Sequence, residues 1–334
     1  PEDDRLDHPT RIFERCMQFS PEALSSFLTF RYLVTPEMRW CSALDAPDWP
    51  DLSQESQVPV RTATEILEFF EEEMAGVTET TGILLSGGID SAILASYLPA
   101  GAKAYTIRFV APGAIDETRA ARQYAERLEL DWNVVEVEWS DYLADAVPLM
   151  LQKRSPSHAI EVALLEAARV AAADGVETLL VGNGADSTFG GMDKLISRDW
   201  TFDEFVERYT FVDPSRAQAE PVSMESVWRA WEREGGFDVL GFLKQVHGIG
   251  IEQSFEAGLH TGGEAIWAPY EKLRLDAPLD IERIRRGDTK YLLRDVFTRR
   301  LPGLEIPEKI PFARPMNVWM KDWAGPVRGE FRSD

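Results

Sequence analysis

Short apolar runs alternate with amphipathic segments between residues 81 and 182. The apolar runs predict strands over 82–85, 102–110, 132–139 and 176–182. The segments between them predict helices over 90–98, 116–130 and 159–175. In the second of these helices, polar residues recur at the spacing of one helix face: Arg119, Arg122, Gln123 and Glu126. This alternation predicts βαβ units, and therefore an α/β fold with a parallel sheet flanked by helices.

The pattern changes on both sides of this region. Before it, helices are predicted over 21–33 and 61–75, separated by a loop that contains proline and tryptophan. After about residue 195 the chain is predicted to be mostly helical. We therefore expect an N-terminal extension or linker at 1–60, an α/β core at 61–195, and a mostly helical C-terminal region at 196–334 that completes the active site.

Composition and charge exclude several classes of protein. The 334 residues are 44% hydrophobic, which is ordinary for a globular protein, and no apolar run is long enough for a membrane helix. The first residues are acidic, unlike a signal peptide, so we expect a cytoplasmic protein without a membrane partner. A net charge of −22 disfavours nucleic acid as a partner. The lysine-poor, acidic composition fits a salt-rich cytoplasm or a GC-rich genome, and both interpretations stay open.

The turn after the first predicted strand carries the candidate chemistry. It has the sequence SGGIDS (86–91) and leads directly into a predicted helix. Glycines let a backbone approach an anion closely, and a helix N-terminus favours negative charge. Asp90 would repel a bare phosphate, so its presence there indicates a cation such as Mg²⁺ between the two. An ordinary capped strand–turn–helix would need no ligand, but five defined residues in this context favour a magnesium pyrophosphate site.

Three further segments give the chain a resemblance to a known family. VGNGADSTFGGM (181–192) is similar to the S-G-E-G-A-D-E-x-F-G-G-Y motif of asparagine synthetases. KYLLRDVFTRRLPGLEIPEKIPFARP (290–315) is similar to their C-terminal segment, and DETRAARQYAERL (116–128) to their D-E…A…A helix. Together with SGGIDS, these segments resemble the synthetase domain of that family, in the ATP pyrophosphatase (PP-loop) superfamily. The resemblance implies an adenine nucleotide alpha-hydrolase-like core.

The resemblance implies a role for individual residues and for ATP and Mg²⁺ as cofactors. The pyrophosphate ligands would be Ser86, Gly87, Gly88, Asp90 and Ser91. Asp90 and Asp186 match the family's magnesium ligands. Positions that contact or lie beside the nucleotide are Leu84, Ile107 and Gly182, and Lys309 matches the catalytic lysine that reaches the phosphates. Lys290 and Arg294 are expected to be helix-surface charges.

Several positions depart from the family pattern. Asn183 stands where the family has a glutamate that handles ammonia and the acyl intermediate, and an amide cannot act as a general base. Ser187 replaces a second acid, and Lys272 follows Pro269-Tyr270 at an acidic position. His260 and Glu264 are weak candidates to replace the missing acid. His158 and His247 are expected to be structural.

The implied reaction is the ATP-dependent formation of an amide. A substrate carboxylate, aspartate by family resemblance, would be adenylated with release of pyrophosphate, and ammonia or an amine would then displace AMP. The 60 residues before the core cannot hold a glutaminase domain, so nitrogen would come from free ammonia, a separate glutaminase subunit or a substrate amine. The oligomeric state is left open.

Other functions stay open. Related enzymes that form lactams or close peptide rings vary at the position of Asn183. A sulfur-transfer enzyme would carry sulfur on a cysteine, whereas Cys16 and Cys41 both precede the loop. An ammonia ligase of the NAD- or GMP-synthetase type would not need the second motif. The changes at Asn183 and Ser187 would also suit a non-catalytic ATP-binding protein.

Overall fold

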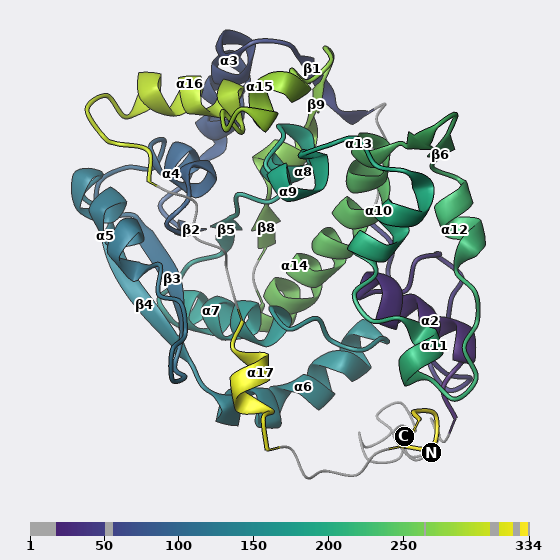
Figure 1. The fold of residues 1–334 in the computed structure, drawn as a ribbon. Coiled ribbons are helices and arrows are strands. Elements are labelled where there is room, and N and C mark those ends of the chain that lie inside the picture. The colour runs from purple at the N-terminus through teal and green to yellow at the C-terminus, as the bar shows by residue number, and fades with distance from the viewer. Residues whose placement is uncertain (1–17, 51–55, 264, 308–313, 323–327, 333–334) are drawn as a thin grey trace.

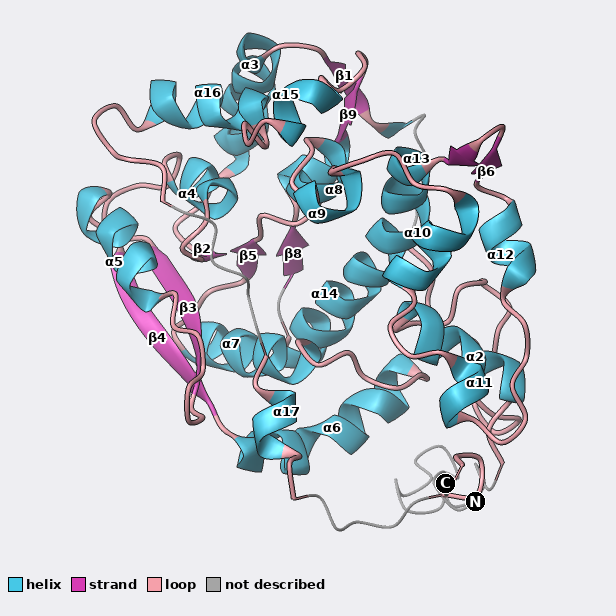
Figure 2. Cartoon of the chain, viewed as in Figure 1, coloured by secondary structure: helices cyan, strands magenta, loops and turns pink. Residues whose placement is uncertain are grey.

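The main feature of the fold is a five-stranded parallel sheet with strand order β4-β3-β2-β5-β8 (Figures 1 and 2). The computed structural model describes residues 18–50, 56–263, 265–307, 314–322 and 328–332. The strands of this sheet are β2 (Thr81–Leu84), β3 (Lys103–Phe109), β4 (Asp131–Val137), β5 (Thr178–Leu180) and β8 (Ala265–Trp267). Two small sheets pair β1 (Val58–Val60) with β9 (Leu273–Leu275) and β6 (Glu232–Arg233) with β7 (Gly236–Phe237).

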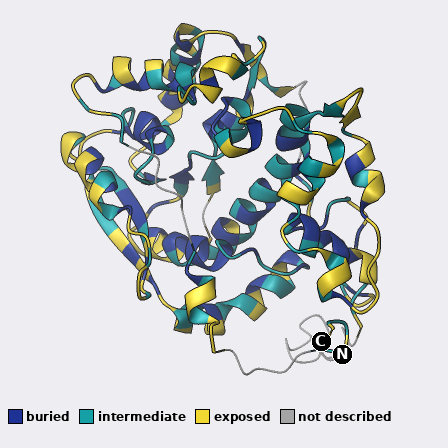
Figure 3. Ribbon diagram, in the orientation of Figure 1, coloured by how far each residue is buried: buried dark blue, intermediate teal, exposed yellow. Residues whose placement is uncertain are grey.

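Helices cover both faces of the five-stranded sheet. Successive residues of a strand point to opposite faces, and Ala104 and Tyr105 of β3 accordingly belong to two different hydrophobic cores. Ala104 lies in a core with α3 (Ala63–Glu73), α4 (Ile89–Ala95), α5 (Thr118–Arg127) and α16 (Tyr291–Arg300). Tyr105 lies in a core with α6 (Trp139–Lys153), α7 (Glu161–Ala173) and α14 (Gly248–Gly262). Both cores are largely buried (Figure 3).

An aromatic core holds the helical region together. The ring of Phe242 lies 4.7 Å from that of Tyr209, 5.2 Å from Trp228 and 5.4 Å from Phe205. Such ring pairs stabilise a core beyond the area that they bury. The helices of this region are α2 (Pro21–Phe30), α9 (Asp193–Ile196), α10 (Phe202–Tyr209), α12 (Glu225–Arg229), α13 (Val239–Phe242), η3 (Leu243–His247) and α15 (Ile281–Arg285). The remaining short helices are η2 (Met74–Gly76), α8 (Ala185–Thr188), α11 (Pro214–Ala217), η4 (Pro269–Lys272) and α17 (Met316–Trp319).

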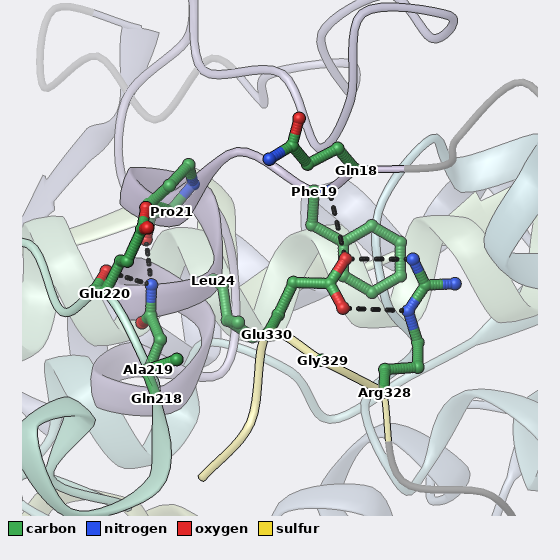
Figure 4. A pocket seen from close by; sticks show the side chains of 10 residues that line it. All are labelled: Gln18, Phe19, Pro21, Leu24, Gln218, Ala219, Glu220, Arg328, Gly329 and Glu330. Carbon is green, nitrogen blue, oxygen red and sulfur yellow. Dashed lines mark hydrogen bonds and ion pairs between the residues drawn. The ribbon is translucent and has the colours of Figure 1, made fainter.

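A cavity of about 510 Å³ lies where the first and last described segments meet (Figure 4). Arg328 stacks on the ring of Phe19 at 3.9 Å and pairs with Glu330 at 2.9 Å. The buried Gln218 accepts a hydrogen bond from Ser25 and donates to the carbonyl oxygens of Pro21 and Glu220. The polar groups around this cavity thus bind one another, as in a structural contact.

The structure confirms the predicted strands and helices from residue 61 to residue 182. It also adds a strand, because β8 pairs in parallel with β5 although it lies in the region expected to be mostly helical. β8 has three residues, too few to show the alternation that identifies a strand. The sheet is therefore completed from beyond the expected boundary at 195. None of the helices in the described ranges is long and apolar enough to span a membrane.

The strand order reverses between β2 and β5, which makes this position the topological switch point of the sheet. Going along the chain, β2 is followed by β3 and β4 on one side, and then by β5 and β8 on the other. Ligands of parallel α/β sheets bind beyond the carboxyl ends of the strands where the order reverses, here between β2 and β5. The segments that follow these two strands are SGGIDS and GNGADS (182–187).

Candidate active site

The loop after β2 is held in shape by two serine hydroxyls. The N–H of Ser86 donates to Oγ of Ser91 at 3.0 Å, and the two hydroxyl oxygens are 2.9 Å apart. The N–H of Gly88 donates to Oγ of Ser86 at 3.2 Å. α4 begins at Ile89 without a side-chain cap, so the start of this helix keeps backbone donors for another partner.

Small residues let the two loops approach each other. A Cβ on Gly182 would lie 3.2 Å from Cβ of Asp90 and 3.3 Å from the backbone nitrogen of Ser91. A Cβ on Gly87 would lie 2.9 Å from Cβ of Ala120, closer than such atoms normally come. Glycine at position 182 therefore lets the loop after β5 lie directly against α4, and glycine at position 87 lets the SGGIDS loop lie against α5.

Lys290 joins the two loops. It precedes α16, and its Nζ lies 2.5 Å from Oδ2 of Asp90 and 2.6 Å from Oδ1 of Asp186. Only 8% of its side chain is exposed. Burial acts to lower the pKa of Lys290, but the charges of Asp90 and Asp186 and the hydrogen bonds to them outweigh it and raise that pKa. The expectation of a helix-surface lysine is wrong, because Lys290 starts the helix with a left-handed backbone and points inward.

A glycine makes room for this contact. A Cβ on Gly191 would lie 1.8 Å from Oδ1 of Asp186 and 2.2 Å from Cε of Lys290. Neither distance is sterically allowed, so any side chain at position 191 would force Asp186 and Lys290 apart. Gly191 belongs to the FGGM end of the second motif, and the structure thus gives that glycine a defined function.

A cavity of about 230 Å³ opens beside the three charges. It is lined by the loop 86–90 and by the following residues: Glu117, Asp186, Gly191, Thr289, Lys290, Arg294, Ile306 and Pro307. Arg294 therefore faces the cavity, and the expectation that it lies on the helix surface is wrong; its Nε donates to the carbonyl of Thr289 at 2.8 Å. Backbone donors and two basic side chains thus face the same space as three carboxylates.

Asn183 belongs to a second group of side chains. Its Nδ2 donates to Oε2 of Glu252 at 2.7 Å and also to Oε1 of Glu271. Glu252 lies on α14 and Glu271 on η4. Burial raises the pKa of Glu271, and its hydrogen bond to Glu252 and the charges of Glu252 and Glu256 raise it further. A cavity of about 50 Å³ lies against Asn183 and Glu271 and is also lined by Ser187 and His247.

Comparison with known proteins decides the family. The family model for asparagine synthase matches residues 76–245, just over half of the chain. The chain belongs to the asparagine synthase family. This confirms the resemblance seen in the sequence and makes the protein an ATP-using synthetase of the PP-loop type.

Solved structures of other synthetases are more distant. NMN synthetase from Francisella tularensis is 14% identical, with a TM-score of 0.27, over 74% of this chain and 97% of its own. NAD+ synthetase from Burkholderia pseudomallei is 14% identical, with a TM-score of 0.21, over 90% of this chain and 99% of its own. No curated protein sequence matches the chain.

The carboxylate pair of this asparagine synthase-family protein fits a divalent cation. Asp90 and Asp186 hold the ammonium group of Lys290 between them, so both carboxylates face a cation. The described residues contain no cluster of three or more acidic, histidine or cysteine ligands. Mg²⁺ does not require one, because it usually binds one or two carboxylates together with water and substrate phosphates.

The predicted nucleotide contacts lie on one face of the sheet. Leu84 of β2 pairs with Tyr105 of β3, and Ile107 is two residues further along β3. Leu84 and Ile107 therefore share a face, and both pack against the core that contains α7. Their contact with a nucleotide stays a prediction. Lys309 lies outside the described residues, as does Glu264.

The histidines differ in their position relative to the site. His260 is exposed and lines a separate cavity of about 290 Å³ with Asp48 and Glu256. His158 is buried beside Arg31, and burial followed by the charges of Arg314 and Arg31 lowers its pKa to about 2. His247 lines the cavity next to Asn183 and lies 2.7 Å from the hydroxyl of Tyr209. Burial and Arg31 lower the pKa of His247 to about 4, so it is neutral at pH 7.

Sequence reasoning missed Glu252 and Glu271, the groups that contact Asn183. Glu271 directly follows Pro269-Tyr270, but the family pattern places the acidic position at Lys272, so it does not mark Glu271. Lys272 pairs with Glu73 of α3 instead. No local signal marks Glu252, which lies in the middle of a helix.

Proposed function

We propose that this protein is an AMP-forming amide ligase. The observation that carries the proposal is the contact of Lys290 with Asp90 and Asp186 at the SGGIDS cavity. A protein that only binds nucleotide needs no buried lysine between two carboxylates at the phosphate end of its site. A ligase needs this arrangement, because negative charge builds on pyrophosphate as it leaves.

In the first step an oxygen of the substrate carboxylate attacks the α-phosphorus of ATP. The bond from that phosphorus to the bridging oxygen breaks, and pyrophosphate leaves with the electron pair. The N–H groups of Gly88 and of the first turn of α4 would bind the phosphate oxygens. Lys290, Arg294 and Lys309 would balance the growing charge. Mg²⁺, held by Asp90 and Asp186, would neutralise phosphate charge.

In the second step an amine attacks the acyl carbon, and AMP leaves. The attacking nitrogen must lose a proton, which Asn183 cannot accept. Its amide instead holds Glu252 and Glu271 side by side. Burial and Glu252 raise the pKa of Glu271, so Glu271 favours its neutral form and the Glu252–Glu271 pair holds one proton between its two carboxyl groups. One carboxylate of the pair is left to accept the proton of the amine. We therefore assign the proton acceptor to this pair and a positioning function to Asn183.

Asn183 also favours a second candidate reaction, in which the amide forms within one substrate molecule. Where the glutamate of the asparagine-forming site is replaced, the attacking amine can belong to the substrate itself, and the product is then a lactam or a closed peptide ring. Free ammonia and ammonia from a separate glutaminase subunit remain the alternatives for the nitrogen source. Aspartate remains the first carboxylate to test.

Product analysis tests the proposal. The protein is incubated with Mg-ATP, ammonium or an amine, and a panel of carboxylates that begins with aspartate and includes amino-carboxylates able to cyclise. We expect AMP and pyrophosphate with one member of the panel, and neither product from Asp90→Ala. ADP and phosphate would contradict the proposal, and so would nucleotide binding without AMP from any carboxylate.

A further inference from the structure

Glu117 lines the cavity beside SGGIDS, where the phosphates of ATP are proposed to bind, and which is called the phosphate cavity below. One of its carboxyl oxygens accepts a hydrogen bond from the described residues, and the other does not. Glu117 comes directly before α5, is 9% exposed, and lines the same cavity as Asp90 and Lys290. Its Oε2 accepts a hydrogen bond from the N–H of Gly87 at 3.2 Å. Its Oε1 is buried and has no hydrogen-bond partner within the described part of the chain.

The hydrogen bond to Oε2 of Glu117 shows that the SGGIDS loop binds an anionic oxygen. The N–H of Gly87 is one of the donors expected to face the phosphates, and here it binds a carboxylate. The second oxygen is the less stable part of the arrangement, because a buried charged oxygen without a partner is unfavourable. A protonated Oε1 would carry a hydrogen that needs an acceptor. A phosphate oxygen in the cavity supplies one.

We propose, on the basis of the proposed ATP site, that Glu117 binds the phosphate chain as a neutral acid, with Oε2 accepting from Gly87 and Oε1–H donating to a phosphate oxygen. Binding of the nucleotide then takes up one proton at Glu117 wherever this carboxyl is ionised in the free protein. Departure of pyrophosphate returns the proton to solvent. Glu117 thereby couples pyrophosphate release to pH.

The surroundings of Glu117 favour the protonated form of its carboxyl group. Burial raises its pKa, the N–H of Gly87 opposes that shift, and the neighbouring charge of Asp116 adds to it. The other charged groups that line the cavity are Asp90 of α4, Asp186 of α8, and Lys290 and Arg294 at α16. Lys290 is already shared by the two aspartates. Negative phosphate next to Glu117 would favour the neutral form further.

The glutamine variant tests the inference because it imitates the neutral acid. In Glu117→Gln the amide oxygen can still accept from Gly87, and its NH2 group can donate to phosphate at every pH. The measurement is the dissociation constant of Mg²⁺-α,β-methylene-ATP by calorimetry between pH 6 and pH 8. We expect wild type and Glu117→Gln to converge at low pH. Above the pKa of Glu117, wild type should weaken relative to the variant by up to about tenfold per pH unit.

Two controls complete the design. Glu117→Ala loses the donor and should bind more weakly than Glu117→Gln throughout. Glu126→Gln replaces an exposed glutamate of α5, the helix that Glu117 precedes, and should follow wild type. Calorimetry of wild type at pH 7.5 in buffers of different ionisation enthalpy measures proton uptake without any variant. Uptake should exceed that of Glu117→Gln by up to one proton.

Parallel pH profiles for wild type and Glu117→Gln would overturn the inference and leave the ATP site intact, as would weaker binding by Glu117→Gln at every pH. Absence of nucleotide binding by wild type itself would overturn the proposed function together with this inference.

Discussion

The cavity beside SGGIDS and the pocket around Asn183 are built in different ways. The first follows from a strand, a turn and a helix that are contiguous in the sequence, joined to a second loop from the neighbouring strand. The second brings together the loop after β5, the middle of α14 and η4, which are 69 and 88 residues apart from Asn183 along the chain. The residues expected to bind ATP are therefore specified mostly by local sequence, whereas the surroundings of Asn183 depend on tertiary packing.

The two regions also differ in charge. At the phosphate cavity a buried lysine balances two aspartates, which suits the binding of anionic phosphates and a metal ion. At Asn183 two carboxyl groups meet an uncharged amide, which suits a cationic or proton-losing amine. Each region can therefore be disturbed separately, and the two half-reactions should respond differently.

Replacing Lys290 should have the largest effect. In Lys290→Met the carboxylates of Asp90 and Asp186, which are 19% and 44% exposed, lose their cation, and we expect a loss of about 1–3 kcal/mol in the free energy of unfolding. We also expect AMP formation to fall by about 10²–10³-fold, because a charge aimed at the leaving group is lost. Rapid quench measures the rate, and urea unfolding measures the stability.

Arg299→Met on the same helix is the matched control for Lys290→Met, since Arg299 is exposed and pairs with Asp295. A wild-type rate of AMP formation in Lys290→Met would show that the lysine is only a structural ion partner.

Gly191→Ala should disturb the same cavity without changing any charge. The added methyl group collides with Asp186 and Lys290, so the carboxylate pair must separate. We expect about 10²-fold slower AMP formation, because a displacement of about 1 Å near the reacting groups has effects of that size. Gly329→Ala is the control, since its Cβ would meet nothing within 4 Å. Equal rates for the two variants would contradict the geometry assigned to the cavity.

Glu271→Gln should separate the two half-reactions. Loss of one carboxyl of the Glu252–Glu271 pair that accepts the proton should slow amide formation by about 10²-fold or more, while AMP and pyrophosphate still form in the first turnover. Single-turnover analysis of both products measures this difference. Equal slowing of both steps would place Glu271 in the adenylation machinery instead.

The sequence predicted the phosphate cavity better than the Asn183 pocket, for a physical reason. The conformation of SGGIDS can be predicted from the sequence, because the strand before it, the glycine turn and the start of the helix are contiguous along the chain. The inward direction of Lys290 could not be predicted, because the local sequence at a helix start does not show whether a charged side chain faces solvent or the interior. Glu252 and Glu271 could not be found, because only the packing of α14 and η4 on the sheet brings them to Asn183. β8 was missed for the related reason that its three residues show no alternation.

Glu256 should give the smallest effect. Burial and the charges of Glu252 and Asp48 raise its pKa to about 7. Its folded-state pKa lies above the unfolded value of 4.5, so its contribution to stability is greatest below pH 4.5 and is lost as the pH rises through 7. Glu256→Gln should therefore melt a few degrees higher than wild type at pH 8 and equally at pH 4.5. A difference that does not change with pH would show that burial of Glu256 is not the cause.

Pyrophosphate exchange into ATP tests directly whether this protein adenylates a carboxylate. Labelled pyrophosphate is added with Mg-ATP and each carboxylate of the panel, without ammonium or amine. We expect that label enters ATP with one carboxylate, and that Asp90→Ala abolishes the exchange. A protein that binds Mg-ATP but incorporates no label with any carboxylate, while releasing ADP and phosphate, would contradict the claim that this cavity cleaves ATP between its α and β phosphates.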